Sequence, residues 1–219
     1  MNKALACHCR PKEEIGHEIG TVLALDFKKK DGASFMDRSV YGHLCTNHGS
    51  KWQLDGRYFD GVNGYVDCGN PDSLMITPNI TVVARVKPTT TAGLQGIYMA
   101  HHSTCYENIG LYVWDGNLRI HKKRETDARE SAGFATIKAG ERTCAAIMIE
   151  GLNWRGYKNG SCTNEGTFID LLQTPNDMVN VGRSIIGGIW KYVDGLLGKV
   201  SLYNFADYAP RILSQSIGG

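Results

Sequence analysis

The chain lacks any long apolar run. None of its 219 residues belongs to a stretch that approaches the roughly 20 apolar residues a helix needs to cross a bilayer. The first residues, MNKALACHCRPKEEIG, contain only Ala4-Leu5-Ala6 as an apolar segment, which is too short for a signal peptide. We therefore expect no membrane insertion, no signal peptide and synthesis in the cytoplasm.

An excess of charge of one sign is also missing. The chain has 24 Lys and Arg against 22 Asp and Glu, and the two signs are interspersed. The longest basic run, Lys28-Lys29-Lys30, is followed at once by Asp31-Gly32, which is typical of a solvated turn. Because no basic field is apparent, we expect no nucleic-acid partner.

Catalytic motifs are missing as well. The sequence contains no G-x-S-x-G, P-loop, GxGxxG or H-E-x-x-H pattern. Its acidic clusters, Glu13-Glu14 and residues 125–130, do not form the alternating carboxylates of a glucanase strand. His101 and His102 precede Cys105, but neighbours at this spacing on a loop seldom face one another, which disfavours a Cys–His nucleophile. We therefore expect no enzymatic activity, and a glycoside hydrolase relative is the least favoured alternative.

The seven cysteines do not suggest a disulfide framework. Their number is odd and their spacing irregular, so a secreted protein would have one thiol left over. Free thiols in a reducing compartment fit better, with several acting as small buried apolar groups. Cys7-His8-Cys9, with His17 downstream, matches zinc spacings poorly because a second ligand pair is missing.

The sequence has, instead, short segments of alternating apolar residues separated by turn signals. Asp115-Gly116-Asn117 and Asn159-Gly160 are turns that accept a positive φ, and no segment has the period of a helix longer than about two turns. This pattern predicts an all-β, antiparallel jelly-roll sandwich of two packed sheets. The expected strands are residues 20–27, 79–88, 96–100, 110–114, 118–121, 134–137, 144–149, 154–158, 178–182 and 192–203.

The remaining segments are interpreted as connections or as an arm. Residues 28–50 are expected to form a polar, glycine-rich connection, and residues 122–131 an exposed charged loop. Residues 1–19 lack period-two alternation, so we interpret them as a short N-terminal arm before a domain of residues 20–219.

One stretch carries a family resemblance. Residues 56–66, GRYFDGVNGYV, resemble the "F-D-G-x-x-x-Y-V" signature of laminin-G-like domains in the concanavalin A-like lectin/glucanase superfamily. Further segments resemble the family in the same order, from about residue 20 to 214: MDRSVYGHLC, NITVVARVKP, RGYKNG and YVDGLLGKVSLYN. The chain departs from the pattern at Arg85, where an aromatic residue is usual, and at Gly156, where a large apolar residue is expected. The resemblance implies the concanavalin A-like form of the jelly roll.

The resemblance also raises the question of calcium, which laminin-G and pentraxin relatives hold at one rim through oxygen ligands. It implies Asp37 as one ligand and a carboxylate on the closing strand as another. That second position is Gly198 in this chain, with Asp194 nearby. Asp26 is a candidate to compensate for the missing carboxylate.

A sugar site needs an exposed aromatic face with polar groups beside it. The candidates are Trp114 with Asp115 and Asn117 at a turn, and Trp190 with Tyr192 on a glycine-rich segment near Arg183. His101 and His102 are candidates for the same rim. The alternative for each tryptophan is a large residue that caps the end of the sandwich, and for Trp154 we prefer that interpretation.

The main hypothesis is therefore a non-catalytic recognition domain that binds a glycan, or a protein surface ligand, through loops at one end of the sandwich. The alternative is a structural or adhesive protein of a phage or viral particle, in which the N-terminal arm docks on a neighbour or on another copy of the chain. The particle-protein alternative would explain the expected cytoplasmic synthesis, the free thiols and the short arm.

Overall fold

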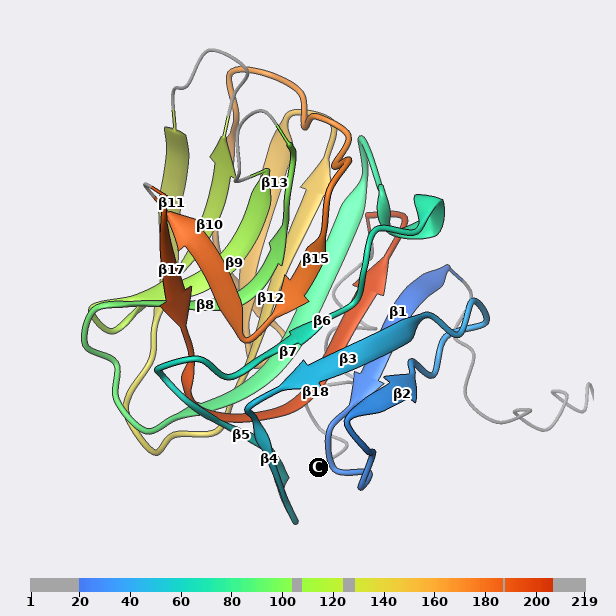
Figure 1. Cartoon of the computed structure of the whole chain (residues 1–219). Helices are drawn as coiled ribbons and strands as arrows, with labels where there is room; N and C mark the ends of the chain where they lie inside the picture. The colour runs from blue at the N-terminus through green and yellow to red at the C-terminus, as the bar shows by residue number, and fades with distance from the viewer. Residues whose placement is uncertain (1–19, 104–107, 124–128, 187, 207–219) are drawn as a thin grey trace, which may run out of the picture.

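Two antiparallel sheets form the protein (Figure 1). The computed structural model describes residues 20–103, 108–123, 129–186 and 188–206. The first sheet has the order β14 (Ser161–Thr167), β13 (Asn153–Lys158), β12 (Thr143–Glu150), β7 (Ile80–Pro88), β18 (Asp194–Tyr203), β5 (Gly56–Asp60) and β4 (Lys51–Gln53), and β1 (Thr21–Asp26) also pairs with β18. The second has the order β11 (Arg129–Thr136), β10 (Asn117–Lys123), β9 (Ile109–Trp114), β8 (Leu94–Ala100), β15 (Val179–Val181), β6 (Tyr65–Asp67), β3 (Leu44–His48) and β2 (Ser34–Met36).

Two smaller elements complete the described chain. A separate hairpin consists of β16 (Arg183–Ile186) and β17 (Ile189–Tyr192), and a 3₁₀ turn covers Asp72–Leu74. Within the described ranges, no helix has the length and apolar character that a bilayer crossing requires. The predicted all-β jelly-roll sandwich is confirmed. The proposed arm, residues 1–19, lies outside the described residues and stays a prediction.

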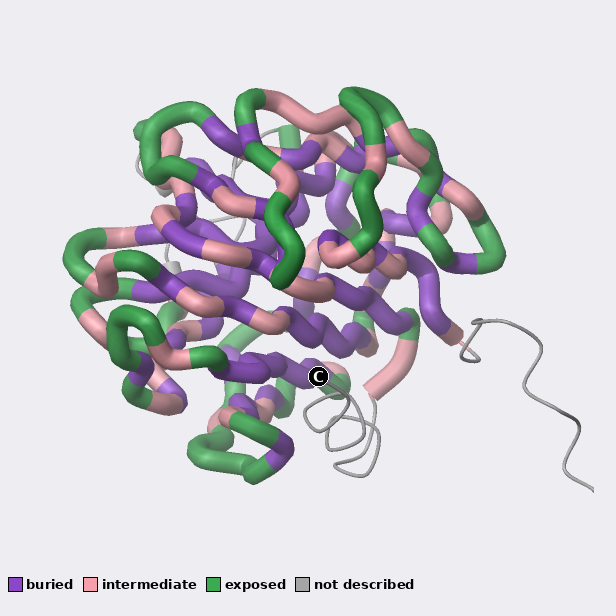
Figure 2. The backbone as a smooth tube through the Cα atoms, turned by 90° about the horizontal axis from the view of Figure 1, so that it is seen from below, coloured by how far each residue is buried: buried purple, intermediate pink, exposed green. Residues whose placement is uncertain are grey.

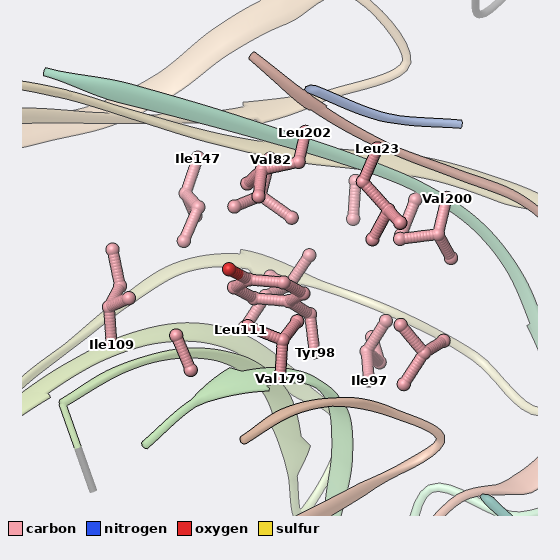
Figure 3. Close-up of a cluster of buried hydrophobic side chains, with 14 of the residues drawn as sticks. Leu23, Val82, Ile97, Tyr98, Ile109, Leu111, Ile147, Val179, Val200 and Leu202 are labelled. Carbon is pink, nitrogen blue, oxygen red and sulfur yellow. The ribbon is translucent and has the colours of Figure 1, made fainter. Parts of the chain in front are cut away.

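The core lies between the two sheets. Val82, Ile147 and Leu202 point from the first sheet toward Leu111 and Val179 of the second (Figure 3), and all five side chains are fully buried. Alternate residues of each strand supply this layer, because successive side chains point to opposite faces of a sheet. Burial accordingly follows the strands, while exposed positions gather at the turns (Figure 2).

The strand predicted at residues 79–88 is confirmed as β7, and it has buried side chains on both of its faces. Val83 is buried although it faces away from the core. The reason is a second apolar cluster on the outer face of the first sheet, against which Phe205 packs. That cluster comprises Val83, Cys144, Ala146, Met148, Tyr157 and Tyr203.

Two predicted loops contain strands. The segment 28–50 contributes β2 and β3, and the segment 122–131 contributes the end of β10 and the start of β11. Charge misled the second prediction, because Lys122 is fully buried. Its ammonium lies 5.1 Å from the Phe168 ring centre and donates to the carbonyl oxygen of Asp170, which satisfies the charge inside the fold.

The predicted tight turns are confirmed. Asp115 has a φ of 45° and Asn159 a φ of 50°, and each is followed by a glycine that also has a positive φ. These conformations match a two-residue hairpin turn whose twist continues that of the flanking strands.

Cysteine behaves as expected wherever the structure describes it. Cys45, Cys68 and Cys144 are buried free thiols, and Cys162 is an exposed one. Burial raises the pKa of the Cys144 thiol, so this group remains protonated and behaves as an apolar residue. Cys7, Cys9 and Cys105 lie outside the described residues.

Gly156 explains one departure from the family pattern. A Cβ atom added at this position would overlap Cγ of Phe134, which comes from β11 of the opposite sheet. Phe134 is buried and therefore supplies, from across the core, the apolar volume that the family pattern places at position 156.

We predict that Gly156→Ala lowers the free energy of unfolding by about 1–3 kcal/mol, because the Phe134 ring must shift within a packed core. Gly32→Ala is the matched control, since Gly32 is exposed and an added Cβ would find its nearest neighbour at 3.7 Å. Urea denaturation of both variants measures the difference, and equal stability of the two would contradict the packing argument.

The turn after β5 depends on a carboxylate. Oδ1 of Asp60 accepts the backbone N–H groups of Val62 at 3.0 Å and Asn63 at 3.2 Å. These bonds, that of Val62 first, lower the pKa of Asp60. Folding therefore gains stability from the ionised form, and this gain is lost as the pH falls through the lowered pKa.

We expect Asp60→Ala to lower the melting temperature at neutral pH, and this difference from the unmodified chain to shrink as the pH is reduced to about 2. Thermal melts across this range, followed by circular dichroism, measure both. A difference that is the same at every pH would exclude the ionised carboxylate as its cause.

Candidate functional site

The hairpin of β16 and β17 crosses the outer face of the second sheet, next to β8 (Figure 1). The backbone N–H of Gly182, just before β16, donates to the carbonyl of Ile97 at 2.9 Å. A Cβ at Gly96 would overlap the fully buried side chain of Ser184. Glycine at this position of β8 therefore lets the hairpin lie directly on the sheet.

This hairpin brings an arginine between two aromatic rings. The guanidinium carbon of Arg183 lies 3.3 Å from the ring centre of Tyr65 and 3.9 Å from that of Trp190. Such distances place the cation in contact with both π faces. Within the described chain, this guanidinium makes one hydrogen bond, in which Nη2 donates to Sδ of Met178 at 3.6 Å.

Three further rings extend the group. His48 stacks on Tyr65, with ring centres 4.3 Å apart and planes inclined by 8°. Tyr192 lies 6.5 Å from Tyr65, and His101 lies 5.6 Å from Trp190. We name this set the aromatic–arginine cluster; its members are His48, Tyr65, His101, Arg183, Trp190 and Tyr192.

Strand pairing explains how the cluster assembles. His48 of β3 is directly opposite Tyr65 of β6, and Arg183 of β16 is directly opposite Tyr192 of β17. Opposite residues of an antiparallel pair point to the same face, so each pair presents both of its side chains together. The rings of His48, Tyr65, Trp190 and Tyr192 are partly exposed, which leaves aromatic surface available to a ligand.

A buried amide lies on the same face. Asn180 of β15 is fully buried and pairs with Asp67, two residues along β6 from Tyr65. Neither its Nδ2 nor its Oδ1 has a hydrogen-bond partner within the described part of the chain. Buried side-chain amides are normally satisfied, so this one needs a water molecule or a ligand.

The structure divides the predicted sugar-binding residues between two places. Arg183, Trp190, Tyr192 and His101 meet in the cluster, whereas Trp114 pairs with Leu94 at the start of β8. The seven residues of β8 separate that position from His101 by roughly 20 Å. The predicted residues therefore do not gather at one end of the sandwich, and ligand binding through end loops stays a prediction.

The second group, Trp114, Asp115 and Asn117, lies at a turn where the two polar side chains already make hydrogen bonds to the backbone. Oδ1 of Asp115 accepts the N–H of Gly93 at 2.7 Å, and Nδ2 of Asn117 donates to the carbonyl of Asp115 at 3.1 Å. Trp114 is 46% exposed, and the Arg119 guanidinium lies 5.4 Å from its ring centre. His102 is half-buried and follows His101 in the chain.

Asp37 does not fit the calcium site that the resemblance implies. Its Oδ1 accepts the N–H groups of Ala24 at 3.0 Å and Ser39 at 2.7 Å. Its Oδ2 accepts the N–H of His43 and lies 2.9 Å from the Nδ1 atom of the same residue. Three backbone N–H donors engage the two oxygens, so the carboxylate holds the chain after β2 in place and has a structural role in the fold.

The other two proposed ligands do not complete a calcium site. Asp26 is opposite Lys199 and Asp194 is opposite Asp60, which places them about five residues apart along β18, or roughly 16 Å. They cannot bind the same ion. Within the described residues, no group of three or more His, Cys, Asp or Glu side chains could hold a metal.

Sequence reasoning missed two members of the cluster, His48 and Tyr65. Tyr65 belongs to the stretch that carried the family resemblance and was interpreted only as part of a turned strand. Its alternation with the buried Val66 shows that it faces outward. His48 lay in a segment interpreted as a connection, so its pairing with Tyr65 had no signal in the sequence.

Comparison with known proteins supports the fold. The family model described as the concanavalin A-like lectin/glucanases superfamily matches residues 60–212. No curated protein matches the chain.

Among solved structures, the binding domain of botulinum neurotoxin serotype G has a TM-score of 0.69 and 11% identity, over 90% of this chain and 50% of that one. A structure of botulinum neurotoxin type C, whose cell entry depends on interaction with two ganglioside molecules, has a TM-score of 0.70 and 10% identity, over 90% and 50%. Trypanosoma rangeli sialidase has a TM-score of 0.69 and 14% identity, over 97% and 35%. The chain thus spans about half the length of the toxin chains, and at these identities the likeness shows the fold alone.

The arginine between two rings should contribute to stability. We predict that Arg183→Ala lowers the free energy of unfolding by about 1–2 kcal/mol, because the cation and its packed alkyl stem are lost together. The control is Arg119→Ala, which removes a longer contact to the exposed Trp114 and should cost less than about 1 kcal/mol. Urea denaturation gives both values, and a larger loss for Arg119→Ala would contradict the assignment.

Proposed function

The chain belongs to the concanavalin A-like lectin/glucanase superfamily, and we propose that it is a non-catalytic recognition module that binds glycans at the aromatic–arginine cluster. The observation that carries this proposal is the position of Arg183 between Tyr65 and Trp190, with partly exposed rings around it.

The chemistry of the cluster suits a sugar ring. The C–H groups of a pyranose stack on aromatic faces, which the partly exposed Trp190 and Tyr192 offer. Tyr65, which is covered by His48 and Arg183, supports the cluster from below. Sugar hydroxyls need fixed hydrogen-bonding groups beside that face, and the Arg183 guanidinium supplies donors whose direction is set by the two rings that hold it. Asn180, buried on the same sheet face without a partner in the described chain, adds an amide that can both donate and accept.

The residues on the strands that carry the cluster favour binding over hydrolysis. Glycoside hydrolysis of the usual kind needs two carboxyl groups, about 5–9.5 Å apart, on either side of the scissile bond. The strands β3, β6, β16 and β17, which carry five of the six cluster residues, contain one carboxylate between them, Asp67. A single carboxylate is insufficient for that mechanism.

The relatives support the ligand class. The botulinum neurotoxin type C structure concerns interaction with gangliosides, which are glycans carried on lipids, and the serotype G structure is a binding domain. We extend glycan binding to this chain as part of the proposal. The particle-protein alternative depends on residues 1–19, which lie outside the described residues, and it stays a prediction.

A glycan array tests the proposal. The unmodified chain should bind a defined set of glycans, and Trp190→Ala should weaken that binding by at least about tenfold, because one stacking face contributes on the order of 1–2 kcal/mol. Trp114→Ala is the matched control: it also removes a partly exposed tryptophan that lies under an arginine, but at a distant turn.

Retention of binding by Trp114→Ala together with its loss in Trp190→Ala would support the cluster as the site. The opposite pattern would move the site to the turn between β9 and β10. If the unmodified chain binds no glycan on the array, the proposed function is wrong.

A further inference from the structure

A pocket lies on the outer face of the first sheet, away from the aromatic–arginine cluster. Its floor is formed by Arg85 and Lys87 of β7, Cys144 of β12, and Leu196 with Gly198 of β18, which are neighbouring strands (Figure 1). Its walls come from Lys28 after β1, Asp55 between β4 and β5, Arg142 before β12, and Asn159 in the turn between β13 and β14. The pocket is partly open to solvent and has a volume of about 130 Å³.

Positive charge dominates this pocket. Four cationic side chains line it, Lys28, Arg85, Lys87 and Arg142, against the single carboxylate of Asp55. Asp55 is itself engaged in an ion pair with Arg142. Lys28 and Lys87 make no ion pair within the described chain. The charges of Lys28 and Lys87 are therefore not compensated by the lining.

These charges come together only in the folded chain. Lys28, the neighbouring pair Arg85 and Lys87, and Arg142 belong to three distant segments, which β1, β7 and β12 bring to one face of the sheet. Lys199, opposite Arg85 across β7 and β18, adds a further cation on this side. The electrostatic influence of Arg85 and Lys199 reaches the Cys144 thiol, where it opposes the effect of burial on the pKa.

The pocket also coincides with two departures from the family pattern. Arg85 stands where an aromatic residue is usual, and Gly198 stands where a carboxylate of the closing strand is expected. One change adds a positive charge to the floor and the other removes a negative charge. Both departures from the pattern make the pocket more positively charged.

The donor and acceptor inventory restricts the ligand further. Lysine and arginine side chains donate hydrogen bonds and accept none, so a ligand here must present several acceptors close together. A guanidinium matches paired oxygens of a tetrahedral oxyanion, and an ammonium adds a point charge. The pocket volume of about 130 Å³ leaves room for one such group.

We propose that this pocket is a second binding site, for the sulfate or phosphate group of a small monoester such as a modified sugar. The site is separate from the aromatic–arginine cluster, and it does not depend on the proposed binding of glycans there. Lys28 and Lys87 bind the oxyanion directly, and Arg142, held by Asp55, closes one side.

Isothermal titration calorimetry at low ionic strength tests this site, with glucose 6-phosphate and glucose 6-sulfate as probes, and glucose and sodium chloride of matched ionic strength as blanks. Inorganic phosphate and sulfate form a further arm, which shows whether the free ion suffices. The unmodified chain should bind one equivalent of at least one of the two esters, and neither blank should give a signal.

The first variant pair tests the cations. The double variant Lys28→Ala/Lys87→Ala should weaken ester binding by at least about tenfold, since two charge-assisted contacts are lost. The control double variant, Lys29→Ala/Lys138→Ala, removes the same number of charges from exposed residues that do not line the pocket. Equal weakening in the control pair would show general charge screening and overturn the proposal.

The second variant pair keeps every cation and so does not depend on the first. An added side chain at Gly198 would find its nearest neighbours at 3.5 and 3.6 Å, which is ordinary contact. Gly198→Asp places a carboxylate in the pocket and should abolish ester binding, whereas Gly198→Asn, of the same shape without the charge, should retain it. Circular dichroism verifies that both variants are folded.

The outcomes are distinct. Loss in Gly198→Asp with retention in Gly198→Asn supports the site, and equal binding by the two overturns it. Binding of free ions with no binding of either ester would reduce the site to an ion site and overturn the ester assignment. Trp190→Ala should leave ester binding unchanged, so failure of this site and failure of the glycan proposal can be told apart.

Discussion

The contact between the two sheets is the constraint on which the rest of the structure depends. Residues that alternate along β7, β12 and β18 meet residues of β8, β9 and β15 in a continuous buried layer. Burial of apolar surface is the main favourable contribution to folding, and it leaves only the outer faces and the turns for interaction with other molecules. Each candidate site described above lies on one of those outer faces.

Neither outer face is simply a polar surface exposed to solvent. On the second sheet, the hairpin of β16 and β17 approaches β8 where Gly96 has no side chain, and this contact sets the position of Arg183 and Trp190. On the first sheet, an apolar cluster that contains Val83 and Tyr203 covers one region, and cationic residues line a pocket in another. In both cases glycines, at positions 96 and 198, leave the space that other groups use.

Local patterns in the sequence predicted the elements well where one physical signal dominated. Alternation located β1 and β7, and the turns at Asp115-Gly116 and Asn159-Gly160 followed from their tolerance of positive φ. The predictions failed where composition and environment disagree. Lys122 is charged but buried against Phe168. The polar segment 28–50 contains β2 and β3, which pair with each other, and β3 joins the sheet through β6, outside the segment.

By itself, the sequence determined the all-β class, the positions of ten strands along the chain and the tight turns, because these depend on neighbours within a few residues. It also identified Arg183, Trp190, Tyr192 and His101 as candidates from residue type. Only the tertiary structure decided that Tyr65 and His48 join them, that Trp114 lies apart, that Asp37 accepts three backbone N–H groups, and that lysines and arginines from separate segments share one pocket. The physical reason is that register and sheet packing fix distances between residues far apart in the chain, and a single sequence read in order carries no measure of those distances.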